Sequence, residues 1–98
     1  MFKIKYHKSV LFEDFKRVVP ADRKRIVKAV EKKLTLAPEI FGKRLSGNLQ
    51  GYFRLRIDPY RIIYRIDKHE ITVFVVCIGL RKDLSVYIEM ARRLKLFE

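Results

Sequence analysis

Arginines alternate with apolar residues in two neighbouring segments of the chain, YFRLRI at 52–57 and YRIIYRI at 60–66. Successive side chains of a strand point to opposite faces, so each segment would place its arginines on one side of a sheet. The guanidinium fork suits bidentate contact with phosphate, and a neighbouring tyrosine offers a plane on which an unpaired base can stack. The pattern therefore favours a surface that contacts an anion, either RNA phosphate or the carboxylates of a partner.

The register follows if Asp58 and Pro59 are the central residues of a tight hairpin turn, because Arg56 then faces Arg61. One face carries Tyr52, Arg54, Arg56, Arg61, Ile63 and Arg65, and the other carries Phe53, Leu55, Ile62 and Tyr64. Opposed like charges destabilise a strand pair, so stability alone would not select this arrangement. We expect four arginines on this face and no acid. The alternative is a charged face that is merely solvated, and the residues alone do not decide.

A second group of candidates follows the most apolar strand, at 71–78. Gly79-Leu80-Arg81 lies where that strand leaves the sheet, and Tyr87 stands six residues after Arg81. Strand ends often carry chemistry. From spacing alone, however, the pattern favours a surface arginine at Arg81 and a core aromatic at Tyr87.

The composition limits the class of protein. The chain has 98 residues, with 23 Lys and Arg against 11 Asp and Glu and a formal charge of +12, which indicates a polyanionic or acidic partner. We expect a single domain spanning residues 1–98. Cys77, the only cysteine, fits a reducing cytoplasm and is expected to be a small buried hydrophobe. No apolar run approaches the roughly 20 residues of a membrane span, and we expect neither a metal nor a cofactor.

The elements that would position these residues have the order β-α-α-β-β-β-α, an α+β fold with helices on a small antiparallel sheet. We predict a strand at 2–7, a helical hairpin over 8–18 and 20–34 with Pro20 in the first turn of its second helix, and a loop at 38–51. A three-stranded meander follows, and then a C-terminal helix whose cap is Asp83.

The stretch LSGNLQGYFRLRIDPYRIIYRIDKHEITVFVVCIGLRKDLSVY at 45–87 resembles the RelE/ParE toxin superfamily, in particular its RelE-type messenger RNA interferases. The shared pieces are an L-x-G loop, a Y-x-R-L-R strand, Y-R-I-x-Y and a G-x-R-x-x-x-x-x-Y ending. The resemblance implies the toxin of a type II toxin–antitoxin system. Such a toxin enters the ribosomal A site and cuts the exposed codon without a metal, through attack of a ribose 2′-hydroxyl on the neighbouring phosphate.

By this resemblance, the catalytic candidates are Arg61, which would stabilise the phosphorane charge, Arg81, which would contact the leaving oxygen, and Tyr87, which would orient or stack against the nucleotide. Arg54 and Arg56 would hold the substrate backbone. Relatives commonly have lysines at these two positions, and arginine is a poorer base than lysine, so the general base stays unassigned. Leu80 stands where several relatives have a histidine or lysine, which disfavours a histidine-dependent site. We also expect RNA-binding contacts from Lys43, Arg44, Tyr52, Arg65 and Lys82.

The implied partners are an acidic antitoxin, which would wrap the basic groove or displace the C-terminal helix, together with messenger RNA and 16S ribosomal RNA, but no membrane. Two other functions stay open. One is a ParE-like inhibitor of DNA gyrase without nuclease activity. The other is a degenerate toxin that only binds its antitoxin.

Overall fold

In the computed structural model, residues 1–81 and residue 93 are described. Within them, one five-stranded sheet has the order β1-β5-β4-β3-β2. Its strands are β1 (Lys3–Tyr6), β2 (Lys43–Arg44), β3 (Tyr52–Ile57), β4 (Tyr60–Asp67) and β5 (Thr72–Leu80). The α+β fold and the meander of β3, β4 and β5 are confirmed. β1 pairs with β5 in parallel, so the sheet is mixed and not wholly antiparallel as predicted. The period-two pattern of a strand does not encode the direction of pairing.

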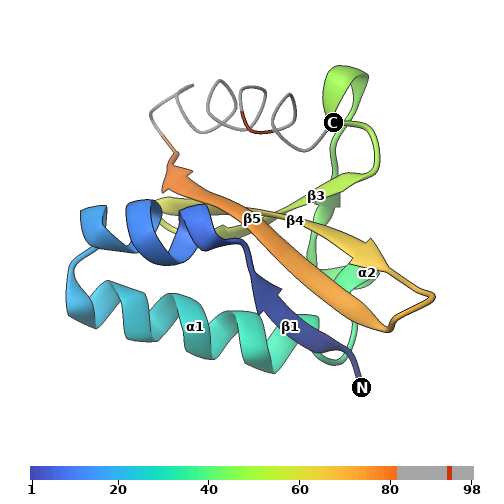
Figure 1. The fold of residues 1–98 in the computed structure, drawn as a ribbon, viewed down its shortest axis with the longest axis horizontal. Coiled ribbons are helices and arrows are strands. Elements are labelled where there is room, and N and C mark those ends of the chain that lie inside the picture. Colours follow the sequence, from blue (N-terminus) through green and yellow to red (C-terminus); the bar gives the residue numbers. More distant parts are fainter. Residues whose placement is uncertain (82–92, 94–98) are drawn as a thin grey trace.

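The helices pack against one face of this sheet (Figure 1). The segment predicted as the first helix winds as a π-helical turn, η1 (Val10–Asp14), followed by a 3-10 turn, η2 (Phe15–Arg17). Helix α1 (Pro20–Leu34) begins with Pro20 in its first turn, as predicted. None of the helices in the described ranges is long and apolar enough to cross a membrane.

The core lies between α1 and the sheet. Its buried side chains come from η1, η2 and α1 and from strands β3, β4 and β5. Among them are Val10, Phe15, Ile26, Val30, Leu34, Phe53, Leu55, Ile62, Tyr64, Val73 and Val75. Ile26, Val30 and Leu34 recur at four-residue intervals, so α1 presents one apolar stripe to the sheet. The opposite face of the sheet is thereby left for the arginines.

The segment at 38–51 was predicted as a loop, and it contains short regular elements. These are α2 (Pro38–Phe41), β2 and the 3-10 turn η3 (Gly47–Leu49). Each is too short to produce a recognisable period. Gly47 and Gly51 have positive φ angles, which glycine adopts without steric cost, so the turn formers in this segment serve the tight reversal into β3.

An irregularity in β5 changes which side chains face the helices. The register between β4 and β5 shifts between Ile63 and Tyr64, and Val76 and Cys77 consequently both pack with Ile63 in a second apolar cluster. Cys77 is buried, as predicted, but it packs in a different cluster from Val73 and Val75, with which it was expected to alternate. The predicted C-terminal helix lies outside the described residues except for Arg93.

Candidate nucleic-acid interface

The strand pairing predicted about the Asp58-Pro59 turn is confirmed. Arg56 pairs with Arg61, Arg54 with Ile63, and Tyr52 with Arg65. The alternate residues Phe53, Leu55, Ile62 and Tyr64 belong to the core beneath α1. Because directly paired residues project to the same side of a sheet, the side chains of Arg54, Arg56, Arg61 and Arg65 project from the face opposite α1. We call this side the arginine face.

Asp58 supplies a carboxylate to two of these arginines. Its oxygens accept hydrogen bonds of 3.0 and 3.1 Å from Arg56 Nε, and Arg56 Nη2 lies 3.0 Å away. Arg61 Nη1 donates to Asp58 Oδ1 at 3.0 Å and to the Tyr60 carbonyl at 2.9 Å. The expectation of an arginine face without an acid therefore needs a correction, because the acid comes from the turn and not from the strands.

The charges in this cluster differ in their exposure. The Arg61 side chain is only 9% exposed, whereas that of Arg56 is 65% and that of Asp58 51% exposed. Hydrogen bonds from Arg56 and Arg61 lower the pKa of Asp58 to about 2, and the bond to Asp58 raises the pKa of Arg56 further above its ordinary value. At neutral pH the cluster thus holds two guanidinium ions around one carboxylate, with a net charge that an added phosphate can neutralise.

The end of β5 is fixed against the same turn. The backbone N–H of Arg81 donates a 2.7 Å hydrogen bond to the Pro59 carbonyl. Asp58, Pro59, Leu80 and Arg81 together line an open hollow of about 400 Å³. The tertiary structure therefore brings the exposed Arg81 to the turn that carries the Arg56–Asp58–Arg61 cluster. Tyr87 and Lys82, the other candidates of this region, lie outside the described residues.

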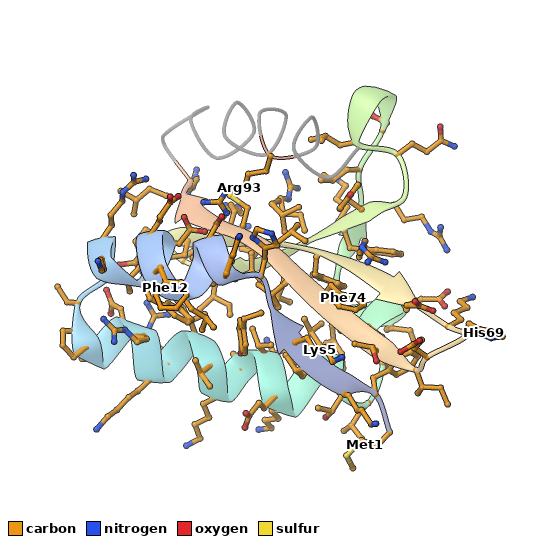
Figure 2. The ribbon with its side chains drawn as sticks, in the orientation of Figure 1. Met1, Lys5, Phe12, His69, Phe74 and Arg93 are labelled. Carbon is orange, nitrogen blue, oxygen red and sulfur yellow. The ribbon has the colours of Figure 1, made fainter. Side chains whose placement is uncertain are left out.

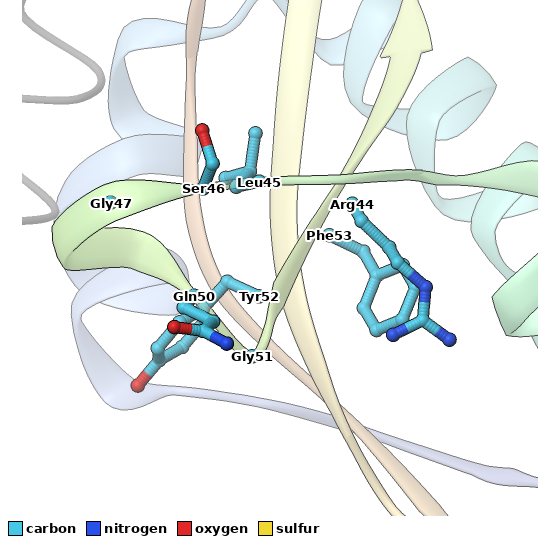
Figure 3. Close-up of a pocket in the computed structure, with 8 residues that line it drawn as sticks. All are labelled: Arg44, Leu45, Ser46, Gly47, Gln50, Gly51, Tyr52 and Phe53. Carbon is cyan, nitrogen blue, oxygen red and sulfur yellow. The ribbon is translucent and has the colours of Figure 1, made fainter.

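The two basic residues of β2 lie on different faces. Lys43 pairs with Arg54 and so belongs to the arginine face, whereas Arg44 pairs with Phe53. The Arg44 guanidinium lies 5.2 Å from the Phe53 ring centre and 3.6 Å from Glu39. Figure 3 shows Arg44 and Phe53 together, on the other side of β3 from Tyr52. Arg44, predicted to bind RNA, is therefore separated from the other candidates, although it also lines the hollow at the start of β3.

A buried ion pair between Asp14 and Arg93 was not predicted from the sequence. Arg93 and Asp14 are 1% and 2% exposed, and Nη1 and Nη2 of Arg93 donate hydrogen bonds to the two carboxylate oxygens of Asp14 at 3.0 and 2.8 Å. Arg93 also donates to the Val76 carbonyl at 2.7 Å, and Asp14 accepts from the Ile78 N–H at 2.9 Å. The two residues are 79 positions apart, so no local pattern marks them. They fasten Arg93 to η1 and β5.

Comparison with known proteins identifies the family. A model described as the ParE toxin of the type II toxin–antitoxin system parDE matches residues 4–84. The chain therefore belongs to this family of type II toxin–antitoxin toxins, and its resemblance to the RelE/ParE superfamily is confirmed.

Individual relatives carry the RelE name. The chain is 32% identical over 59 residues to the mRNA interferase toxin RelE of Escherichia coli and to the mRNA interferase RelE of Shigella flexneri. That match covers 59% of this chain and 62% of the relative, which is less than two thirds of the relative's length. Among solved structures, the RelBE2 toxin–antitoxin complex of Mycobacterium tuberculosis is similar with a TM-score of 0.76 and 26% identity, covering 82% of this chain and 98% of that one. The isolated E. coli RelE toxin, at 19% identity, a TM-score of 0.70 and coverage of 96% and 99%, shares the fold.

Proposed function

We propose that this chain is an mRNA interferase, a ribosome-dependent endoribonuclease that needs no metal and acts in the cytoplasm as a single domain. The observation that carries the proposal is the gathering of Arg56 and Arg61 around the hairpin turn to which the backbone of Arg81 is bonded. The sequence identity of 32% over 59 residues with proteins named mRNA interferase supports the same conclusion.

The reaction would join the 2′-oxygen of one ribose to the adjacent phosphorus and release the 5′-oxygen of the next nucleotide. It requires a base that takes the 2′-hydroxyl proton, stabilisation of the added phosphorane charge and a proton for the leaving oxygen. Arg61 suits the first task because its guanidinium is almost buried and is held at two points, on Asp58 and on the Tyr60 carbonyl. Arg81 would contact the leaving oxygen, and Tyr87 would orient the nucleotide.

Arg56 is not suited to be the general base. Its hydrogen bond to the Asp58 carboxylate raises the pKa of Arg56, so its guanidinium holds the proton more tightly than usual. Arg54 and Arg56 would instead hold the substrate backbone. Alignment of the codon by the ribosome would supply much of the remaining rate enhancement, because correct positioning alone can contribute several kcal/mol.

Programmed ribosomes test the proposal directly. The purified chain should cut messenger RNA at defined codons in the presence of a chelator. Arg61→Ala should lower the cleavage rate by about a hundredfold or more, as expected for loss of a charge-stabilising donor. Arg25→Ala, on the exposed side of α1, is the matched control and should cut at the parent rate. Intact message at high protein concentration would rule out the interferase.

A gyrase inhibitor is the second candidate, and the match to a ParE family model favours it. This function would leave messenger RNA intact and produce DNA breaks that depend on gyrase. Arg81→Ala separates the two, because it should abolish cleavage by an interferase while leaving antitoxin binding intact. A degenerate toxin would bind antitoxin and show neither activity.

The partner of this chain would be an acidic antitoxin. Solved structures of related toxins include complexes with their antitoxins, such as the archaeal RelE–RelB complex of Pyrococcus horikoshii and the RelBE2 complex. The formal charge of +12 supports an acidic partner. We expect this partner to cover the arginine face or to displace the C-terminal segment, and the toxin to contact messenger RNA and 16S ribosomal RNA once it is released.

A further inference from the structure

Cations and aromatic rings alternate across four neighbouring strands at the end of the arginine face remote from the Asp58 turn. Lys5 of β1 pairs with Phe74 of β5, Phe74 pairs with Arg65 of β4, and Arg65 pairs with Tyr52 of β3. One residue from each strand thus forms a continuous line. We call Lys5, Phe74, Arg65 and Tyr52 the cross-strand row.

Contacts within the cross-strand row place charge next to aromatic surface. The Arg65 guanidinium carbon lies 4.3 Å from the centre of the Phe74 ring, and Lys5 Nζ lies 5.9 Å from the same centre. Figure 2 shows Lys5 and Phe74 on the adjacent strands β1 and β5. Phe74 packs against the apolar cluster of Ile63, Val76 and Cys77, but it is only half-buried, so part of the side chain is open to solvent.

The row lines an open hollow of about 490 Å³, together with His7 and Val76. This volume lies within the range of about 300 to 1,000 Å³ that small-molecule pockets occupy. The described residues that line the hollow include three cations, Lys5, Lys8 and Arg65, and no carboxylate. A hollow with aromatic walls and this charge suits a flat, anionic ligand.

The row also has a defined position relative to the arginine cluster. Arg61 and Arg65 both belong to β4 and are four positions apart, so they share the arginine face. At 3.2 to 3.4 Å per residue, they stand about 13 Å apart along the strand. A single strand of RNA that lies along this face can therefore reach both places with different nucleotides.

We propose that the cross-strand row binds one unpaired nucleotide of an RNA strand whose scissile phosphate lies at Arg61. The base stacks on the flat surfaces of Tyr52, Phe74 and the Arg65 guanidinium, and the flanking phosphates pair with Lys5 and Arg65. This inference rests on the proposed function and deepens it, since it assigns the substrate a second contact outside the reacting phosphate. Base stacking accepts any base, so the row would contribute affinity more than sequence preference.

Binding of a non-cleavable oligonucleotide tests the row without the ribosome. The probe is a fluorescent single-stranded hexanucleotide with 2′-O-methyl groups, which cannot supply the attacking hydroxyl. Phe74→Leu, which keeps apolar bulk without a ring, should weaken binding about five- to a hundredfold. Phe74→Tyr restores a ring and should bind like the parent. Phe12→Leu removes an aromatic of η1 that is 64% exposed and lies outside the row, and it should also leave binding unchanged.

The salt dependence of binding tests the charge of the row separately. It also tests the proposal if Phe74→Leu does not fold. Lys5→Gln should reduce the slope of log affinity against log salt by about 0.7, the value of one single-strand phosphate contact. Lys24→Gln, on α1, should leave the slope unchanged. An unchanged slope for Lys5→Gln, or parent affinity for a folded Phe74→Leu, would overturn the proposal.

A glutamate-rich peptide distinguishes a protein partner from RNA. If Phe74→Leu weakens the binding of this peptide and leaves the binding of the oligonucleotide unchanged, the row is a protein-docking surface and the inference is overturned. The cleavage assay separates this result from the proposed function. If the parent cuts no messenger RNA but Phe74→Leu still weakens binding of the oligonucleotide, the nucleotide site is supported and the interferase function is refuted. If the parent cuts message and Phe74→Leu binds normally, the reverse holds.

Discussion

Arg61 of β4 donates a 3.0 Å hydrogen bond to the carboxylate of Asp58, which stands three residues earlier in the turn. The same carboxylate accepts from Arg56, the residue directly opposite Arg61 in the hairpin. Two like charges that face each other across a strand pair are destabilising, and Asp58 offsets this repulsion from within the same hairpin. The protein thus carries one of its own anions at the place where we propose that a phosphate binds.

The titration of Asp58 should report this contact. The Arg56 and Arg61 hydrogen bonds lower the pKa of Asp58 to about 2, against about 3.9 for an unperturbed aspartate. A lowered pKa in the folded state means that the stabilisation is complete above about pH 4 and is lost as pH falls towards 2. Carbon-detected NMR of the Asp58 carboxyl should therefore give a midpoint near 2, and Arg56→Gln should move it upward. A midpoint near 4 in the parent would contradict the geometry.

Neutralising Asp58 should strengthen the binding of RNA. Asp58→Asn removes the only carboxylate that contacts Arg56 and Arg61 within the described residues, so both guanidinium groups can turn fully to phosphate. We expect a several-fold gain in affinity for single-stranded RNA at low salt, decreasing as salt screens the charge. Glu70→Gln changes the net charge equally at the distant β4–β5 turn and serves as the control. Equal gains in both variants would show that net charge alone is responsible.

The buried pair of Asp14 and Arg93 should be essential for stability. Asp14→Asn removes the buried carboxylate that pairs with the Arg93 guanidinium, which is 1% exposed. Breaking a buried pair from one side typically costs about 3 to 5 kcal/mol, and urea denaturation should show a loss of this size in the free energy of unfolding. Glu13 lies 3.5 Å from Arg93 and is half-exposed, so Glu13→Gln should cost less than about 1 kcal/mol. Similar losses for the two variants would argue against the bidentate pair.

Gly42 is required by its close approach to Tyr64. A Cβ at Gly42 would lie 1.8 Å from Tyr64 Oη, and the Tyr64 side chain is fully buried with its hydroxyl donating to the Pro38 carbonyl. Gly42→Ala should lower the free energy of unfolding by about 1 to 3 kcal/mol, as overpacking does. Tyr64→Phe removes the atom in closest conflict, so the double variant should lose less than the sum of the two single losses. Simple additivity in thermal or urea unfolding would refute the contact.

The Cys77 thiol should be unreactive in the native protein. The residue is 1% exposed and packs with Ile63 and Val76, so a thiol-specific disulfide reagent can reach it only when the structure opens. Modification should be slow in buffer and fast in denaturing urea. Rapid modification in buffer would show that this part of the sheet opens readily.

The faces of the central hairpin could be read from the sequence alone. Side chains alternate along any strand, and a two-residue turn sets the register by counting, so the positions of Arg54, Arg56, Arg61 and Arg65 on one face needed no further information. The same holds for the start of α1 at Pro20, whose ring fits the first turn of a helix. The face on which Arg44 lies, opposite to that of Lys43, could not be predicted, because β2 is too short to show its own alternation.

Local pattern by itself thus determined the faces of β3 and β4, the apolar stripe of α1 and the basic character of one surface. Only the tertiary structure decided that β1 lies parallel to β5, which creates the line from Lys5 to Tyr52, and that a bulge turns Cys77 away from Val75. It also decided that Asp58 serves two arginines and that Asp14 meets Arg93. Each of these contacts depends on pairing direction, on register or on side chains that reach across the fold. Periodicity within one segment carries no information about such relationships between segments.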